Sequence, residues 1–271
     1  MKTQLIDTHV HLQSDAYAAD LDAVLARAAE AGVVTCIVPG TTLQDSHAAV
    51  ALAKRPSLYA AVGIHPTEAD TLTSQSLDEL RALARQPRVV AIGEIGLDYY
   101  WPRQTRRDWP CATPARQREA LRAQLELAAE LHLPVIIHDR EAHEDTLEIL
   151  AAWVAGGAGR TGTLHAYDGG PERLAAVLEL GFCIGMDGPI TYRKSPELPA
   201  VARQVPLERL LLETDGPYLT PAPHRGQRNE PAYLLLIAQH IAELRGVPVK
   251  TLIETTTANA RRLFGIDRNE G

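Results

Sequence analysis

The 271-residue sequence contains no run of about 18 apolar residues, the length that a membrane-spanning helix requires. Asp7 and His9 come before an apolar stretch of the signal-peptide type could form, so we expect no export. The three cysteines, Cys36, Cys111 and Cys183, are odd in number and far apart. This usage argues against a disulfide framework and suits a reducing compartment, so we expect a cytoplasmic protein.

The chain also has no excess of basic residues, with 27 Lys and Arg against 34 Asp and Glu and a formal net charge of −7. This balance argues against sequence-independent binding of a nucleic-acid duplex by a basic face, although it permits a local basic funnel. Low-complexity tracts and interdomain linkers are lacking too. At 45% hydrophobic and 23% charged residues, the composition is that of a globular protein, and the length suits one α/β barrel domain.

Short apolar runs alternate with helix-like segments along the whole chain. The helix-like segments repeat apolar residues at spacings of three and four, as in residues 21–28. The expected strands lie near residues 4–8, 33–38, 58–63, 89–94, 134–138, 162–165, 181–185 and 209–214. This alternation predicts an α/β fold, a TIM (β/α)8 barrel of parallel strands that forms a single domain over residues 1–271. An open doubly wound sheet is the alternative architecture.

Five histidines fall at the carboxyl ends of expected strands. His9 and His11 share one face of the first strand, because side chains repeat with period two. Such a pair can chelate one metal ion, or it can be a pair of hydrogen-bonded core histidines. His65, His138 and His165 follow later apolar runs in the same way. Together these positions favour metal ligation.

Two acidic residues, Glu94 and Asp215, also end expected strands. A buried carboxylate without a partner is costly, so each should meet a cation or a hydrogen-bond network, and a salt bridge or a helix cap is the alternative. In a closed barrel the last strand neighbours the first, which brings Asp215 beside His9 and His11 at the face where barrel active sites lie. Four imidazoles and two carboxylates are too many for one tetrahedral ion and suit two ions about 3.5–4 Å apart. Glu94 is then the natural bridging ligand.

Several stretches of the chain match the motifs of a known family. They are Asp7–Leu12, Gly63–Pro66, Gly93–Tyr99, Ile137–Ala142, Leu212–Leu219, Arg225–Pro231 and Ala258–Gly265. In these stretches the sequence resembles the TatD family of metal-dependent deoxyribonucleases, within the amidohydrolase superfamily of TIM barrels. The ligands that the resemblance implies are His9, His11 and Asp215 for one divalent ion, His138 and His165 for the other, and Glu94 between them.

The sequence departs from the family pattern at three places near the expected substrate site. Asp139 follows the histidine of the fifth expected strand, and Ala166-Tyr167-Asp168 follows that of the sixth. Residues 101–114, rich in Arg, Pro and Trp, form a loop longer than the family norm before a helix that begins near Arg116. These departures leave the metal ligands in place and bear on substrate preference.

Two divalent ions, with Zn, Mn and Mg as candidates, would activate water for hydrolysis. Asp215 is the candidate general base. His65 is a second candidate catalytic residue, either as a hydrogen-bond donor to a phosphoryl oxygen or as a support for another ligand. The substrate-contact candidates are Arg140, Arg225 and Arg228 for phosphate and Tyr99, Tyr167 and Tyr218 for stacking on bases. Ordinary surface or packing roles compete with each of these assignments, and packing is the favoured role for Tyr218.

The predicted function is therefore metal-dependent hydrolysis of phosphodiester bonds in DNA, at single-stranded or frayed 3′ ends. We expect neither a membrane nor an obligate protein partner. The alternative is an amidohydrolase-type reaction on a small ester, lactone, amide or phosphotriester. That branch of the superfamily often uses a carboxylated lysine as its bridge, whereas this chain has Glu94 there and its few lysines lie away from strand ends. A third reading is a binding protein that has kept its ligands but lost catalysis.

Overall fold

The computed structural model describes residues 4–103 and 111–266 of the chain. Residues 104–110 lie outside this description, and with them half of the long loop expected at 101–114. The first residues of this loop belong to a short helix, Tyr100–Arg103, and its last residues lead into a helix that begins at Pro114.

Eight parallel strands form one sheet in which every strand pairs with the next along the chain. The strands are β1 (Leu5–Asp7), β2 (Val33–Pro39), β3 (Leu58–Val62), β4 (Val89–Asp98), β5 (Val135–Arg140), β6 (Gly162–Leu164), β7 (Cys183–Met186) and β8 (Leu210–Leu212). All eight expected strands are confirmed, and the single-domain barrel with them.

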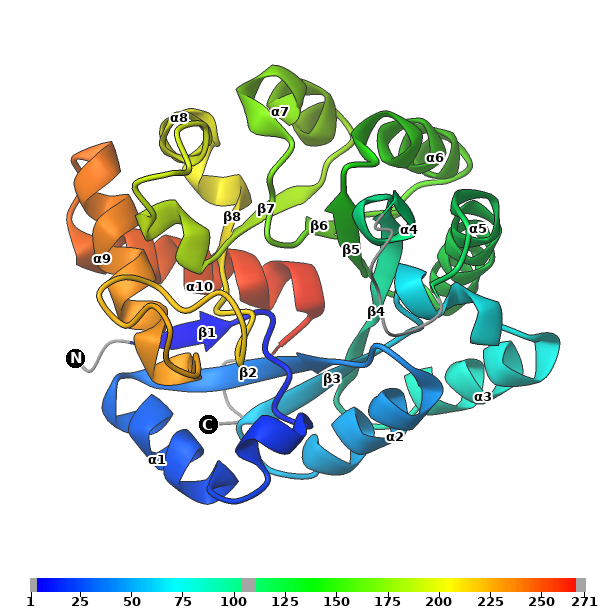
Figure 1. Ribbon diagram of the computed structural model, residues 1–271, viewed down its shortest axis with the longest axis horizontal. Coiled ribbons are helices and arrows are strands. Elements are labelled where there is room, and N and C mark those ends of the chain that lie inside the picture. Colours follow the sequence, from blue (N-terminus) through cyan, green and yellow to red (C-terminus); the bar gives the residue numbers. More distant parts are fainter. Residues whose placement is uncertain (1–3, 104–110, 267–271) are drawn as a thin grey trace.

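Helices lie outside the strands and surround the barrel (Figure 1). They are α1 (Leu21–Glu30), α2 (Leu43–Leu52), α3 (Ser74–Ala84), α4 (Tyr100–Arg103), α5 (Pro114–Leu131), α6 (His143–Ala155), α7 (Gly170–Glu179), α8 (Leu198–Gln204), α9 (Leu234–Arg245) and α10 (Val249–Phe264). Short 3-10 turns are η1 (Asp15–Tyr17), η2 (Pro66–Thr71), η3 (Gly188–Thr191), η4 (Leu207–Arg209) and η5 (Pro231–Tyr233). Within residues 4–103 and 111–266, no helix is both long and apolar enough to cross a membrane.

Local chemistry explains where the helices begin and end. The hydroxyl of Thr113 accepts a hydrogen bond from the backbone of Arg116, and Pro114 occupies the first turn of α5, where its missing N–H costs nothing. At the other end of the chain, α10 stops at Gly265, whose φ of 63° is the left-handed conformation that glycine adopts without strain.

The barrel closes where the chain after β1 meets the chain after β8, at a seam formed by residues 7–11 and 212–216. The Thr8 amide donates to the Leu212 carbonyl at 3.1 Å, and the Asp215 amide donates to the His9 carbonyl at 2.9 Å. Beneath them, the buried Asp7 carboxylate accepts hydrogen bonds from the amide and hydroxyl of Thr214, at 3.0 and 2.6 Å. The seam thus brings the predicted ligands of the first and last strands together.

Two apolar clusters hold this architecture in place. The larger one packs the helices onto the outside of the strands. The smaller one joins side chains of seven strands, Ile37 and Ile136 among them, to Ala260, Phe264 and Ile266. Residues at the end of α10 therefore complete the apolar filling of the barrel, while its polar groups gather at the carboxyl ends of the strands.

Candidate metal centre

His9 and His11 lie just beyond the end of β1, where the backbone is still extended because Val10 bridges to Gly216 at the seam. Their imidazole rings lie edge-on to each other, with the two Nε2 atoms 3.2 Å apart. Asp215 joins them from the end of β8, with Oδ1 at 3.3 Å from Nε2 of His11 and 3.7 Å from Nε2 of His9. The structure thus brings these three predicted ligands together.

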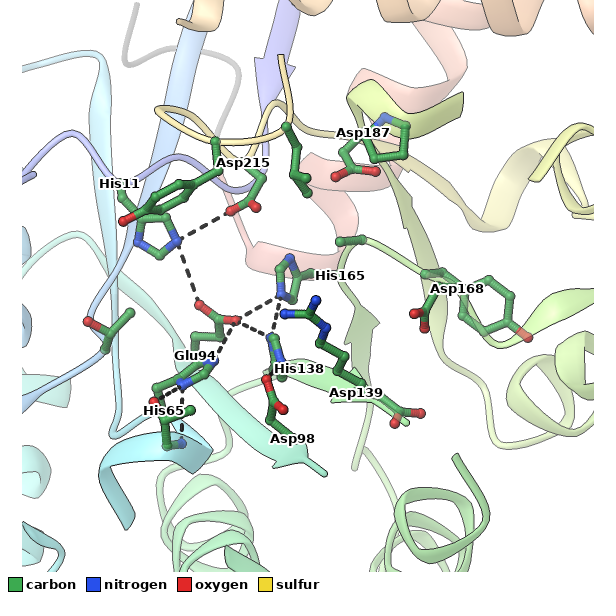
Figure 2. A pocket seen from close by; sticks show the side chains of 18 of the residues that line it. His11, His65, Glu94, Asp98, His138, Asp139, His165, Asp168, Asp187 and Asp215 are labelled. Carbon is green, nitrogen blue, oxygen red and sulfur yellow. Dashed lines mark hydrogen bonds and ion pairs between the residues drawn. The ribbon is translucent and has the colours of Figure 1, made fainter. Parts of the chain in front are cut away.

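Glu94 occupies the middle of β4 rather than its end, because β4 continues to Asp98. The register of β4 against β5 shifts between Ile92 and Ile95, and such an irregularity re-aims the side chain within it. The Glu94 carboxylate is 3% exposed and is directed toward the middle of the barrel mouth (Figure 2).

Histidines from both sides of the barrel reach the two carboxylate oxygens of Glu94. Oε1 lies 2.8 Å from Nδ1 of His138 on β5 and 2.8 Å from Nε2 of His165 after β6. Oε2 lies 3.4 Å from Nε2 of His9 and 3.7 Å from Nε2 of His11. Glu94 is therefore the group that connects the two halves of the predicted ligand set.

These donors fit a divalent cation centre. In the described part of the chain, three sets of side chains have ligand atoms within 4.8 Å of one another: His9, His11 and Asp215; His9, Glu94 and His165; and His65, Glu94 and His138. Imidazole nitrogens with carboxylate oxygens are the donors that zinc and manganese take in proteins. His65, for which the sequence offered no ligand position, belongs to one of these sets.

The electrostatics of the centre also favour a cation. Burial would raise the pKa of Glu94, but the surrounding imidazoles, that of His165 first, hold the pKa well below its ordinary value. Burial would lower the pKa of His138, yet hydrogen bonds with Asp98 and Glu94 raise it to about 9. The carboxylates thus stay ionised and draw positive charge into the centre, and bound cations can supply that charge.

His65 follows β3 and caps η2. Its Nδ1 accepts a hydrogen bond from the backbone N–H of Thr67 at 3.2 Å. Burial, with a smaller contribution from His138, lowers the pKa of His65 to about 3. A neutral imidazole whose Nδ1 accepts carries its proton on Nε2, which lies 3.6 Å from Oε1 of Glu94. His65 can therefore donate a hydrogen bond at the edge of the centre.

Two supporting carboxylates were not singled out from the sequence. Asp98 is 1% exposed and holds the outer nitrogen of His138, Nε2, at 3.2 Å. Glu213 is fully buried, accepts a hydrogen bond from the Ala166 amide at 2.5 Å and lies 3.7 Å from Nδ1 of His165. The sequence does contain a signal for both residues. Asp98 lies four positions after Glu94, and Glu213 lies two positions before Asp215, so each pair is expected to share one face of a strand.

The centre forms the floor of a cavity of about 1090 Å³ at the barrel mouth. Of the predicted phosphate-binding residues, Arg140 lines this cavity, with its guanidinium 3.9 Å from the centre of the Tyr100 ring. Arg228 is turned away and makes two hydrogen bonds to Asp20, at 2.7 and 2.8 Å. Arg225 lies over the ring of Tyr192, outside the described lining of the cavity.

The tyrosines differ in their access to the cavity. Tyr99 is 9% exposed, and its hydroxyl is bound by Asp145 and Arg118. Tyr167 lines the cavity but is 5% exposed, with its hydroxyl donated to the Gly170 carbonyl. Tyr218 lines the cavity at 59% exposure, with its ring 6.0 Å from that of His11. Exposure therefore favours Tyr218 for stacking, although the sequence favoured a packing role for it.

Asp139, one of the departures from the family pattern, is directed toward α6. Its Oδ2 lies 2.9 Å from Nδ1 of His143, and Asp168 approaches the other nitrogen of the same imidazole at 3.9 Å. This group of side chains lies beside the metal centre and flanks His138 without joining the candidate ligand sets of the described chain.

Comparisons with known proteins agree with this geometry. The model of the family described as TatD-related DNase matches residues 6–265. The chain is 37% identical to the uncharacterized metal-dependent hydrolase YabD of Bacillus subtilis, over 97% of this chain and 100% of that protein. It is 40% identical to the 3′-5′ ssDNA/RNA exonuclease TatD of Salmonella typhimurium, over 97% of this chain and 99% of that protein.

Among solved structures, the chain resembles that of YjjV, a TatD homologue from Escherichia coli K12. The two share 33% sequence identity and a TM-score of 0.89, over 98% of this chain and 100% of that one. The match extends across the barrel and includes the strands that carry the metal centre.

Proposed function

The chain belongs to the TatD-related DNase family and is a metal-dependent hydrolase. From this premise we propose that it removes nucleotides from the 3′ end of single-stranded DNA and that it uses two divalent ions. The relatives named as 3′-5′ ssDNA/RNA exonucleases, such as that of Salmonella typhimurium, support this choice of substrate. Because these relatives are named for both nucleic acids, the rate of hydrolysis of an RNA strand should be compared with that of single-stranded DNA.

The observation that carries the proposal is the position of Glu94. Its Oε1 faces His138 and His165, while its Oε2 faces His9 and His11. One carboxylate placed between two sets of imidazoles suits two ions better than one. We assign His9, His11 and Asp215 to one ion, and His138 and His165 to the other.

When bound, divalent ions supply Lewis-acid activation of water and of the phosphoryl group. Burial would raise the pKa of Asp215, but the hydrogen bond with His11 and the charge of His9 keep the pKa below its ordinary value. Asp215 is therefore ionised and is our candidate to accept the proton of the attacking water. Nε2 of His65, which lies on the Oε1 side of Glu94, donates a hydrogen bond to a phosphoryl oxygen of the substrate.

The cavity supports a substrate that enters end-on. Arg140 is the one arginine or lysine in its described lining, whereas carboxylates such as Asp45, Glu68 and Glu197 stand around it. An extended polyanion would place several phosphates against this acidic wall at a cost in Coulomb energy. A strand end needs to bring one phosphate to the centre, and the exposed ring of Tyr218 can stack on a base beside it.

A panel assay tests the proposal. We expect metal-stripped protein to regain activity with Mn²⁺, Mg²⁺ or Zn²⁺, to shorten a 5′-labelled single strand from its 3′ end, and to leave a blunt duplex nearly intact. Asp215→Asn, purified identically, should lower kcat by about 10²–10⁴-fold at saturating metal, which also excludes a contaminating nuclease. Hydrolysis of a lactone or a paraoxon-like ester without any action on DNA would instead support the amidohydrolase alternative.

A further inference from the structure

Asp187 is a buried carboxyl group in the cavity wall that the proposed chemistry does not use. It is 4% exposed, and its Oδ2 has no hydrogen-bond partner in the part of the chain that the structure describes. Asp187 is the N-cap of η3, a position where aspartate usually binds the backbone of the first turn. Its side chain makes no such bond, so the carboxyl group is directed elsewhere.

The direction follows from the strand that precedes it. Cys183 on β7 belongs to the cluster inside the barrel, and a Cβ at Gly185 would meet the buried carboxylate of Glu213. Asp187 continues this alternation and therefore faces the barrel interior. Figure 2 shows its carboxylate above the metal centre, on the same side as Asp215.

The backbone around Asp187 is closely packed. Gly188 lies so close to the chain after β8 that a Cβ there would collide with the carbonyl oxygen of Leu219. The Asp187 carbonyl also accepts a hydrogen bond from Ile190 at 3.2 Å. Asp187 is thus presented to the cavity by a turn that packs closely against the chain after β8.

The surroundings of Asp187 restrict the ligand that can satisfy its free oxygen. A buried polar atom without a partner costs free energy, so a partner that arrives with the substrate strengthens binding. Glu213 and Asp215 face Asp187 from the neighbouring strand and add negative charge, so a phosphate oxygen is a poor partner. A hydroxyl group suits the position, because it pairs with a carboxyl group in either protonation state.

We propose that Asp187 binds the free 3′-hydroxyl of the terminal nucleotide and makes the site selective for 3′-hydroxyl ends. This inference rests on the proposed exonuclease function. The nucleotide to be released carries the scissile phosphate and the 3′-hydroxyl on one sugar. Because β7 pairs with β8, a nucleotide whose phosphate lies near Asp215 can bring the hydroxyl of the same sugar to Asp187, which follows β7.

The test compares two 5′-labelled single strands of one sequence, ending in a 3′-hydroxyl or in a 2′,3′-dideoxy nucleotide. We expect wild type to have a kcat/KM about tenfold or more higher on the hydroxyl end, because the dideoxy end leaves the buried carboxyl group of Asp187 without a hydrogen-bond partner. Asp187→Ala should act equally on both strands, and Asp187→Asn, which keeps one acceptor oxygen, should retain part of the preference. Asp168→Asn removes a carboxylate from the same cavity wall and should keep the full preference.

Equal rates of wild type on the two strands, or an unchanged preference in Asp187→Ala, would overturn the inference. A separate measurement does not depend on turnover: calorimetry of deoxyadenosine 5′-monophosphate and its 2′,3′-dideoxy analogue in the presence of Mn²⁺. We expect tighter binding of the hydroxyl form by wild type and equal binding by Asp187→Ala. A wild type that degrades neither strand contradicts the proposed exonuclease function, and the calorimetric comparison then decides whether Asp187 binds the hydroxyl.

Discussion

At the scale of single residues, Glu94 has the most demanding position in the molecule. It is almost fully buried, it is ionised, and imidazoles that lie on or just after β1, β3, β5 and β6 face its two oxygens. Charge of this kind is stable in a barrel interior only where cations or hydrogen bonds compensate it. The consequences of removing this carboxylate therefore extend to both halves of the centre.

We predict that Glu94→Ala loses metal from both halves of the centre and loses activity with it. The measurement is the metal content per chain after gel filtration, by elemental analysis. Glu68→Ala, which removes another carboxylate from the cavity wall, should keep its metal. Two ions per chain in Glu94→Ala would show that Glu94 is not shared.

Arg140 and Arg228 should differ in their contribution to substrate binding, because their side chains have different surroundings. Arg140→Ala should raise KM by about tenfold and reduce the log–log salt slope of binding by about one, because Arg140 is the guanidinium in the cavity lining. Arg228→Ala should leave both quantities unchanged and lower the urea midpoint, because Arg228 is held by Asp20. Steady-state kinetics at several salt concentrations decide this, and the reverse pattern in the two variants would contradict the assignment.

At the scale of elements, the seam between β1 and β8 connects the fold to the site. Burial raises the pKa of Asp7 to about 7, against the hydrogen bonds that Thr214 donates to its carboxylate. The backbone bonds of the same seam position His9 and Asp215 opposite each other. A substitution in the seam should therefore lower the free energy of unfolding, even where the catalytic residues themselves are unchanged.

Thr214→Val should destabilise the protein by about 1–3 kcal/mol, because it leaves the buried Asp7 carboxylate with one fewer donor. Chemical unfolding in urea measures the loss. Thr255→Val is the matched control, since the Thr255 hydroxyl bonds the carbonyl of Thr251 one turn earlier in α10. A Thr214→Val midpoint as close to wild type as that of the control would rule out the proposed role of the seam.

The sequence was sufficient to predict the eight strands, because each is a short apolar run between helical segments. It placed Glu94 at the end of a strand, whereas β4 continues to Asp98. The shift of register that turns Glu94 inward depends on its pairing with β5, which no local pattern records. The same holds for Arg228, whose partner Asp20 lies 208 positions earlier in the chain.

At the scale of the whole molecule, negative charge predominates both in the chain and around the cavity. The chain carries a net charge of −7, and the described cavity lining contains a single arginine among several carboxylates. Such a cavity repels a polyanion unless bound cations offset its charge. Metal ions bound in this cavity would therefore contribute to substrate affinity, to catalysis and to folding stability together.

The most direct test is a metal titration of stripped protein with activity on a 5′-labelled single strand as the readout. We predict that activity rises with added Mn²⁺ and reaches its plateau at two ions per chain, with products that shorten one nucleotide at a time from the 3′ end. A plateau at one ion per chain, or full activity in stripped protein with EDTA present, would contradict the account.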